Sequence, residues 1–244
     1  MEKLTDLDYW INVHGVPDLI LDNEIIEKWI NSNLDGVDIT SAIEVGCYPG
    51  KYLTILGKKG VEVNGIDYIP DVVVLDQLFR KNGYRVGEFI NADFTKFNFE
   101  KKFDCVMSFG FIEHFYNWEE MMLKHLDLVS KKGYVIIEVP NFKGFFQRLP
   151  RMIYDWRNYK RHNIDSMQLE KWIMILDRQG FELVSADYFG GYNLWFEENS
   201  KNKYILKSRF YLVRLLNKIR IKLFPENRDH KSFSSFIGVI AKRK

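Results

Sequence analysis

The sequence predicts an open, doubly wound α/β sheet within one domain that spans residues 1–244. Apolar runs rich in Val and Ile, bounded by Gly or Asp, are typical of strands buried on both faces of a parallel sheet. Segments with helical spacing lie between these runs, and this alternation is the signature of the fold class. A chain of 244 residues with 46% hydrophobic and 28% charged content is long enough for one well-buried core.

The predicted strands are apolar runs that lie between turn residues. An N-terminal region, residues 1–40, carries helical patterns and comes before all of them. The first four runs are residues 41–46 (SAIEVG), 60–67 (GVEVNGID), 103–110 (FDCVMSFG) and 133–141 (GYVIIEVPN). Two further runs near the C-terminus are residues 181–189 (FELVSADYF) and 234–242 (SSFIGVIAK).

Two helices are predicted most clearly between the strands. The first begins after Asn117, a good N-cap with Glu120 three residues on, and ends before Gly133. The second begins near Asp165 and ends before Gly180. Both repeat apolar residues at helical spacing, which predicts one face packed against the sheet.

Two inserts interrupt the alternation. The first, residues 141–165, is crowded with aromatic and basic side chains and is too long for a simple connection. The second, residues 190–231, contains YILKSRFYLVRLLNKIRIKLF, which has no helix breaker and predicts one basic amphipathic helix or two. We expect both inserts on the acceptor side of a site whose cofactor half is residues 41–140, because later segments must lie on the other half of the crevice.

Composition narrows the class of protein. Lys and Arg total 35 against 33 Asp and Glu, so the net charge of +2 gives no global reason to expect nucleic acid or an anionic membrane as partner. Cys47 and Cys105 lie in apolar runs, no signal peptide pattern precedes them, and no apolar stretch reaches the length of a membrane span. These features predict a reducing, cytoplasmic location.

Residues 42–56 (AIEVGCYPGKYLTIL) predict a strand, a glycine turn and a helix. In open α/β sheets ligands bind at such turns, beyond the carboxyl ends of the strands. Gly46 and Gly50 let the backbone take positive φ and approach a ligand closely. Asp67 lies 67 − 46 = 21 positions after Gly46, the spacing at which a carboxylate accepts ribose hydroxyls. The turn and the carboxylate together indicate a ligand that contains a nucleoside.

The turn favours a cationic ligand. Glu44 precedes Gly46 in E-V-G-C-Y-P-G, and a buried carboxylate would repel a pyrophosphate. With four motifs in order between residues 41 and 189, the chain resembles the class I S-adenosylmethionine-dependent methyltransferases, whose first motif is written (D/E)-x-G-x-G-x-G. The resemblance implies a Rossmann-like sheet of seven strands with an antiparallel last strand and helices on both faces. It also implies S-adenosyl-L-methionine as cofactor and S-adenosyl-L-homocysteine as product.

The resemblance implies roles for single residues. Asp67 and Tyr68 in GIDYIP would face the ribose, and Asp93 and Phe94 in INADF would face the adenine. The other cofactor candidates are Glu44, Gly46, Cys47, Tyr48 and Gly50 in the first motif and Ser108, Phe109 and Gly110 in FDCVMSFGFIEHF. Tyr48 departs from the pattern because it stands at the middle glycine. We expect its side chain to point away from the cofactor or to close over its methionine end; the alternative is an inactive relic whose pocket Tyr48 fills.

Methyl transfer from a sulfonium is an in-line displacement that depends on positioning, and only a hydroxyl acceptor needs a base. Histidine suits this task at neutral pH, and the candidates are His114 in FIEHF and His162 in YKRHN. A purely structural role is the alternative for each, and His14, His125 and His230 are assigned to the surface or to packing. No HExxH or clustered Cys/His pattern occurs, so no metal site is expected.

The aromatic and basic residues of the inserts predict the chemical class of the methyl acceptor. Their aromatic residues would form a platform, with the core of an added subdomain as the alternative: Phe145, Phe146, Tyr154, Trp156, Tyr159, Tyr192 and Trp195. Interleaved basic residues would suit an anionic acceptor such as a sugar nucleotide or a phosphorylated small molecule, with a solvated face as the alternative: Arg148, Arg151, Arg157, Lys160 and Arg161.

The layout of the chain is also similar to bacterial methyltransferases encoded with surface-polysaccharide or natural-product pathways, which favours O-methylation of a sugar. Alternatives are N-methylation of a small amine, RNA methylation, and a non-catalytic adaptor. RNA methylation is disfavoured because the basic segment 201–222 is the only candidate surface for nucleic acid. The adaptor would use the same basic helix, within residues 201–224, for peripheral contact with a membrane or a partner.

Overall fold

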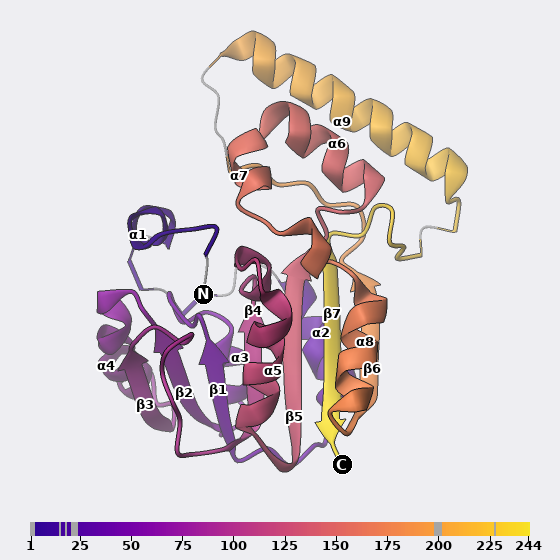
Figure 1. Cartoon of the computed structure of the whole chain (residues 1–244). Helices are drawn as coiled ribbons and strands as arrows, with labels where there is room; N and C mark the ends of the chain where they lie inside the picture. The colour runs from indigo at the N-terminus through magenta and orange to yellow at the C-terminus, as the bar shows by residue number, and fades with distance from the viewer. Residues whose placement is uncertain (1–2, 15, 18, 21–23, 198–201, 227) are drawn as a thin grey trace.

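A computed structural model describes residues 3–14, 16–17, 19–20, 24–197, 202–226 and 228–244. Seven strands form one sheet in the order β3-β2-β1-β4-β5-β7-β6 (Figure 1). The strands are β1 (Ser41–Val45), β2 (Glu62–Asp67), β3 (Val86–Asn91), β4 (Phe103–Phe109), β5 (Val129–Pro140), β6 (Phe181–Phe189) and β7 (Phe236–Arg243). β1 to β5 are parallel where they pair, and β7 runs antiparallel to both of its neighbours, β5 and β6. The predicted sheet with an antiparallel last strand is confirmed.

Helices cover both faces of the sheet, as predicted, because the strands are apolar on both sides. One face carries α2 (Glu24–Leu34), α3 (Leu53–Gly57) and α4 (Val74–Lys81), which share a buried core with the sheet through residues such as Ile30, Leu53 and Phe79. The other face carries α5 (Trp118–Leu128) and α8 (Leu169–Arg178), whose Trp118 and Trp172 lie in a second core (Figure 1). Short 3-10 helices are η1 (Pro70–Val73), η2 (Ile112–His114) and η3 (Ile164–Ser166).

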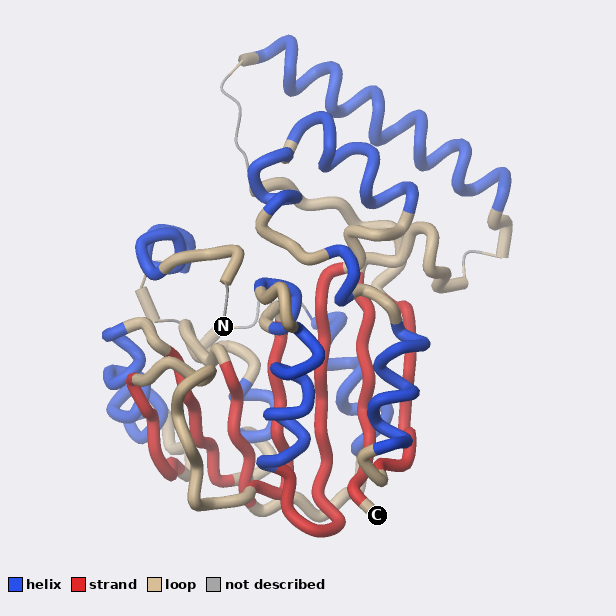
Figure 2. The backbone as a smooth tube through the Cα atoms, viewed as in Figure 1, coloured by secondary structure: helices blue, strands red, loops and turns tan. Residues whose placement is uncertain are grey.

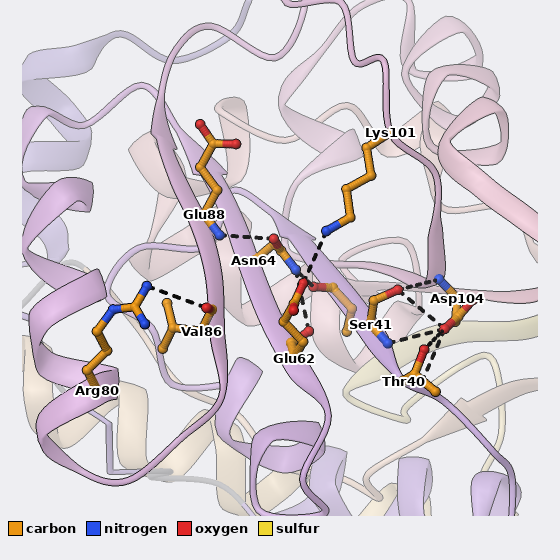
Figure 3. Close-up of polar contacts among 10 residues, drawn as sticks. Thr40, Ser41, Glu62, Asn64, Arg80, Val86, Glu88, Lys101 and Asp104 are labelled. Atoms are coloured by element: carbon orange, nitrogen blue, oxygen red, sulfur yellow. Dashed lines mark hydrogen bonds and ion pairs between the residues drawn. The ribbon is translucent and has the colours of Figure 1, made fainter.

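Polar contacts join neighbouring strands toward the amino ends of the sheet, opposite the glycine turn (Figure 3). The Asp104 carboxylate, at the start of β4, accepts hydrogen bonds from Thr40 and from the backbone N–H of Ser41 at 3.2 Å. Lys101 pairs with Glu62 at 3.1 Å, at the start of β2. These contacts fix the central strands at one end and leave the other end to form a site.

The inserts form one subdomain above the carboxyl ends of the strands (Figures 1 and 2). Residues 141–165 form α6 (Phe145–Tyr154) and α7 (Trp156–Lys160), and the second insert forms a single helix, α9 (Lys203–Leu223). Phe146 of α6, Leu216 of α9 and Phe233 make a small core of their own. α9 therefore packs on α6. Within the described part of the chain, no helix combines the length and apolarity needed to cross a bilayer.

Helix α5 begins directly after Asn117 as predicted, but two other predicted boundaries lie a few residues away from the observed ones. α5 ends at Leu128, and the chain continues directly into β5 from Val129, four residues before Gly133. The side chain of Asn117 donates to the Glu120 carboxylate at 2.6 Å and makes no capping bond to the backbone. The helix predicted from Asp165 begins at Leu169, because residues 164–166 form η3.

Candidate active site

A cavity of about 340 Å³ lies at the carboxyl ends of β1, β2 and β4, where the strand order reverses. Its size is within the range of small-molecule sites. Among the described residues, every cofactor candidate from the sequence borders this cavity except Gly50 and Ser108. Ser108 is instead buried in β4, and the Gly50 position packs against Leu75 and Phe79. The sheet topology thus gathers motifs that are dispersed along the chain.

The turn after β1 requires glycine for a reason visible in the packing. Gly46 has φ of +74°, and a Cβ atom there would lie 2.7 Å from the Phe111 ring. Its backbone N–H donates to the Ile66 carbonyl at 2.9 Å, which ties the turn to β2. Any side chain at residue 46 would strain the backbone and displace Phe111, which also borders the cavity.

Asp67 holds the glycine turn in place. Its carboxylate accepts hydrogen bonds from the backbone N–H groups of Tyr48 at 3.1 Å and Ile69 at 3.0 Å. Burial raises its pKa, and these two hydrogen bonds oppose the rise. The Tyr48 side chain is 3% exposed and belongs to the core cluster that contains Ile69 and Leu75, while it also borders the cavity. The tyrosine therefore packs in the wall and leaves the cavity open.

Glu44 supplies a buried carboxylate to the floor of the cavity. The side chain is 2% exposed, and its Oε2 has no hydrogen-bond partner among the described residues. Burial raises the pKa of Glu44 well above its ordinary value, and the neighbouring Asp67 carboxylate adds to this rise. A cationic ligand group would offset the cost of this buried carboxylate.

An N-terminal segment covers the cavity, which the sequence analysis missed. Lys3 pairs with Asp93 at 2.8 Å and lies over the Tyr68 ring at 4.5 Å. The Trp10 ring of α1 (Leu7–His14) packs edge-on against His114 at 4.9 Å between centroids. Residue 3 and residue 93 share no local pattern, so no signal in the sequence could have paired them.

Both catalytic candidates lie in one cluster beside the cavity. His114 borders the cavity, and its ring lies 4.7 Å from the His162 ring, which is not among the lining residues described. Buried Glu113 is the third member, with Oε1 at 3.8 Å from His114 Nε2. Burial raises the pKa of Glu113 to about 8, and burial together with His114 keeps the pKa of His162 well below its ordinary value. No motif in the sequence marks Glu113 as a functional side chain, and only the proximity of residues 113 and 162 in the fold reveals the cluster.

The aromatic and basic residues of the inserts are not gathered around the cavity. Among the described lining residues none of the predicted aromatic platform appears, and Phe146 and Tyr192 pack instead in the core shared by α6 and α9. Of the predicted basic residues, Arg151 is fully buried over the Phe142 ring, and only Arg161 borders a hollow, a second one next to α1. His125 and His230 pack as expected, in the sheet core and against Phe224; the side chain of His14 lies outside the described part of the chain.

Comparison with known proteins identifies a family for this chain. A family profile described as a methyltransferase domain matches residues 23–186. The chain belongs to the class I S-adenosylmethionine-dependent methyltransferases. Proteins of this family use S-adenosylmethionine as their cofactor.

Among curated relatives, a ubiquinone biosynthesis O-methyltransferase of Rickettsia prowazekii is 28% identical over 118 residues, which are 48% of this chain and 46% of that protein. The chain thus spans about half the length of the curated relatives it matches. The solved structure of the MccD protein superposes with a TM-score of 0.59 at 17% identity and covers 90% of this chain and 96% of its own. The N-methyltransferase NodS of Bradyrhizobium japonicum, solved with S-adenosylhomocysteine, has a TM-score of 0.52 at 11% identity over 99% of this chain and 94% of its own. These structures confirm the fold.

The residues of the cavity fit the cofactor. Glu44 offers an unpartnered carboxylate oxygen to a cation, and the cofactor carries an ammonium group and a sulfonium. Gly46 leaves bare backbone at the cavity wall. Asp67 and Asp93 offer carboxylates at the ends of neighbouring strands, as a ribose and an adenine amino group would need.

Proposed function

We propose that this methyltransferase transfers a methyl group to a hydroxyl of a small molecule, with a sugar or nucleotide-linked sugar as the leading acceptor class. The observation that carries the choice of a hydroxyl is the histidine cluster at the cavity wall, because only a hydroxyl acceptor requires help in losing its proton. The names of the curated O-methyltransferase relatives support a hydroxyl acceptor.

Residues of the cavity divide into two proposed roles. Glu44, Gly46, Cys47, Tyr48, Asp67, Tyr68, Asp93, Phe94, Phe109 and Gly110 border the cavity, and we assign them to the cofactor. Gly50 belongs to the turn and has φ of +106°, and Ser108 is buried within β4. Bound S-adenosylmethionine supplies an electrophilic methyl group, so the residues of the chain need only align the acceptor and manage its proton.

His114 and His162 are the proposed groups that activate the acceptor hydroxyl. His114 Nδ1 donates to the Arg161 carbonyl at 2.9 Å, which fixes the ring against the first insert. The acceptor would enter near the hollow that Tyr9, Arg161 and Glu197 line beside α1. Arg161 is the one predicted basic residue at that hollow among those described, and the proposed preference for an anionic acceptor rests on it.

The runner-up reaction is N-methylation of a small amine. It would make the two histidines dispensable for proton removal, because a neutral amine attacks without a base. The name of the structural neighbour NodS, an N-methyltransferase, is compatible with this alternative, but a likeness at 11% identity concerns the fold alone.

A contact between α9 and an anionic membrane is a second proposal. Within Lys203–Leu223 the helix carries no acidic residue, and its basic residues alternate with apolar ones. Tyr204, Phe210 and Leu223 are each at least 60% exposed on this helix. Amphipathic basic helices of this kind bind anionic lipid surfaces. Co-sedimentation with anionic vesicles but not with neutral ones is the expected result, and equal recovery from both would remove the proposal.

Acceptor screening tests the proposed reaction. The protein would be incubated with S-adenosylmethionine and a panel of nucleotide-linked sugars, phosphorylated sugars, free sugars, phenols and small amines, with formation of S-adenosylhomocysteine and the mass of the acceptor as readouts. We expect methylated product only from hydroxyl acceptors. Turnover of amines alone would replace this function by the runner-up.

A further inference from the structure

The histidine cluster is held rigidly by the backbone of two segments that are distant in sequence. Glu113 and His114 lie in η2, and His162 follows α7 of the first insert. The Asn163 N–H donates to the Glu113 carbonyl at 2.7 Å, next to the bond from His114 Nδ1 to the Arg161 carbonyl. One donor atom from each of Glu113, His114 and His162 lies within 4.8 Å of the others.

Each of the two rings has one nitrogen against a backbone carbonyl. A carbonyl oxygen can only accept, so His114 carries its hydrogen on Nδ1, and His162 does the same because its Nδ1 lies 2.8 Å from the Asn158 carbonyl. In the neutral rings the lone pair is therefore on Nε2 in both residues. Donation from one ring nitrogen to a backbone carbonyl, with the other nitrogen directed at an ion, is the usual arrangement around bound metals.

The Glu113 carboxyl group has no other explanation in the structure. The residue is fully buried, and neither carboxyl oxygen has a hydrogen-bond partner among the described residues. Oε1 of buried Glu138 also lacks such a partner, and burial together with the Glu113 carboxylate raises the pKa of Glu138 well above its ordinary value. Buried carboxyl groups of this kind are costly unless a cation or a proton accompanies them.

The carboxyl group lies directly behind the cavity wall. Gly110 borders the cavity with φ of +61°, and a Cβ atom at this position would lie 3.5 Å from Glu113 Oε1. His114 borders the same cavity. An ion bound by the cluster would thus be close to a ligand in the cavity.

We propose that Glu113, His114 and His162 bind a divalent first-row transition metal ion at the wall of the cavity. Two imidazoles and one carboxylate favour Zn²⁺, Fe²⁺, Co²⁺ or Mn²⁺ over Mg²⁺ and Ca²⁺, which prefer oxygen ligands alone. Bonds of about 2.1 Å keep any two ligand atoms within about 4.2 Å of each other, so the widest separation would have to shorten by at least roughly half an ångström when the ion binds. The site departs from the expectation that no metal is bound, which rested on motif spacing alone.

The role of the ion rests on the proposed function. Three protein ligands leave open positions at which an acceptor hydroxyl binds, loses its proton to solvent and becomes a stronger nucleophile. Its oxygen then forms the bond to the methyl carbon as the carbon–sulfur bond breaks, and the electron pair of that bond remains on sulfur. The two histidines thereby act on the hydroxyl through the ion.

Metal binding by the full chain tests the site without any methyl transfer. Protein stripped with a chelator would be titrated with Co²⁺, followed by visible absorption, and with Zn²⁺, followed by calorimetry. We expect one ion per chain and a loss of affinity of about 100-fold or more in Glu113→Gln and in His162→Gln. Exposed Glu119→Gln and the insert variant His230→Gln are matched controls that should bind as the wild type does. Binding of S-adenosylhomocysteine by each variant verifies its fold.

Two results would overturn the site: no saturable binding by the wild type, or equal affinity in the wild type and in both ligand variants. The outcome is separate from that of the proposed function. A stripped enzyme that methylates a hydroxyl acceptor at the full rate overturns the metal's role and leaves O-methylation intact. Stoichiometric binding that both ligand variants lose supports the site whichever acceptor is found.

Discussion

The cofactor half and the insert subdomain are built in opposite ways. The cofactor half consists of short motifs at the ends of neighbouring parallel strands, and single backbone groups such as the N–H of Tyr48 fix its side chains. The insert subdomain consists of helices that are far apart in sequence, held by side-chain packing such as that of Phe146 against Leu216. The difference teaches that short motifs predicted which residues of the first region border the cavity, whereas composition did not predict which side chains of the second region face it.

The largest expected effect concerns the cofactor half. Asp67→Ala should weaken binding of S-adenosylhomocysteine by about 1.5 to 3 kcal/mol, or roughly 10- to 150-fold, since hydrogen bonds to a charged group are lost. The Tyr48 and Ile69 N–H groups would also lose their acceptor. Calorimetry measures the change, with exposed Asp71→Ala as the control. Unchanged affinity would remove Asp67 from the ribose site.

Acid sensitivity should also originate in this half. His125 is fully buried beside the Phe94 ring, and burial lowers its pKa to about 4. A folded-state pKa below the unfolded one means that stability is complete above pH 6.5 and falls as the pH drops toward 4. We expect His125 to account for a loss of about 2 kcal/mol in the free energy of unfolding between pH 7 and pH 4.5, and His125→Met should remove that part of the pH dependence while the part due to buried His162 stays. Urea unfolding at several pH values is the measurement; an equal pH dependence in the variant would contradict it.

Variants of two arginines in the first insert distinguish a contact with the acceptor from a general effect of surface charge. Arg161 pairs with Glu197 at 2.9 Å and stacks on Tyr9 beside the second hollow, whereas Arg157 is exposed on α7. Arg161→Ala should raise the apparent KM for acceptor about fivefold, or roughly 1 kcal/mol, and Arg157→Ala should leave it within twofold. S-adenosylhomocysteine affinity should stay constant in both. Equal effects of the two changes would instead indicate that both arginines contact the acceptor.

The smallest expected effect is at the contact between the N-terminal segment and the cavity. Lys3→Ala removes the ion pair with Asp93, whose side chains are 24% and 27% exposed, so the affinity for S-adenosylhomocysteine should change by no more than about threefold. Lys28→Ala, which breaks the exposed pair with Glu24, is the control. A loss greater than tenfold would show that the N-terminal segment belongs to the cofactor site.

The sequence by itself determined the sheet and the family, and it predicted most of the residues that we assign to the cofactor. Parallel strands bring their carboxyl ends to one edge whatever the length of chain between them, so Glu44, Gly46 and Asp67 could be placed together from local motifs alone. Gly46 and Asp67 also make hydrogen bonds with backbone groups close to them in the fold. Such contacts require a particular residue type at a particular position, and a short sequence motif shows this requirement.

Only the tertiary structure decided what closes the site. Lys3 meets Asp93, His162 meets His114, and α9 meets α6 across 54 residues between Tyr154 and Ser208. These contacts depend on how loops and helices pack, and neither hydrophobic periodicity nor motif spacing encodes such a pairing. The aromatic residues of the inserts illustrate the reason, because the same composition is suitable for a ligand platform and for a hydrophobic core. In the folded chain Phe146 and Tyr192 pack in the core.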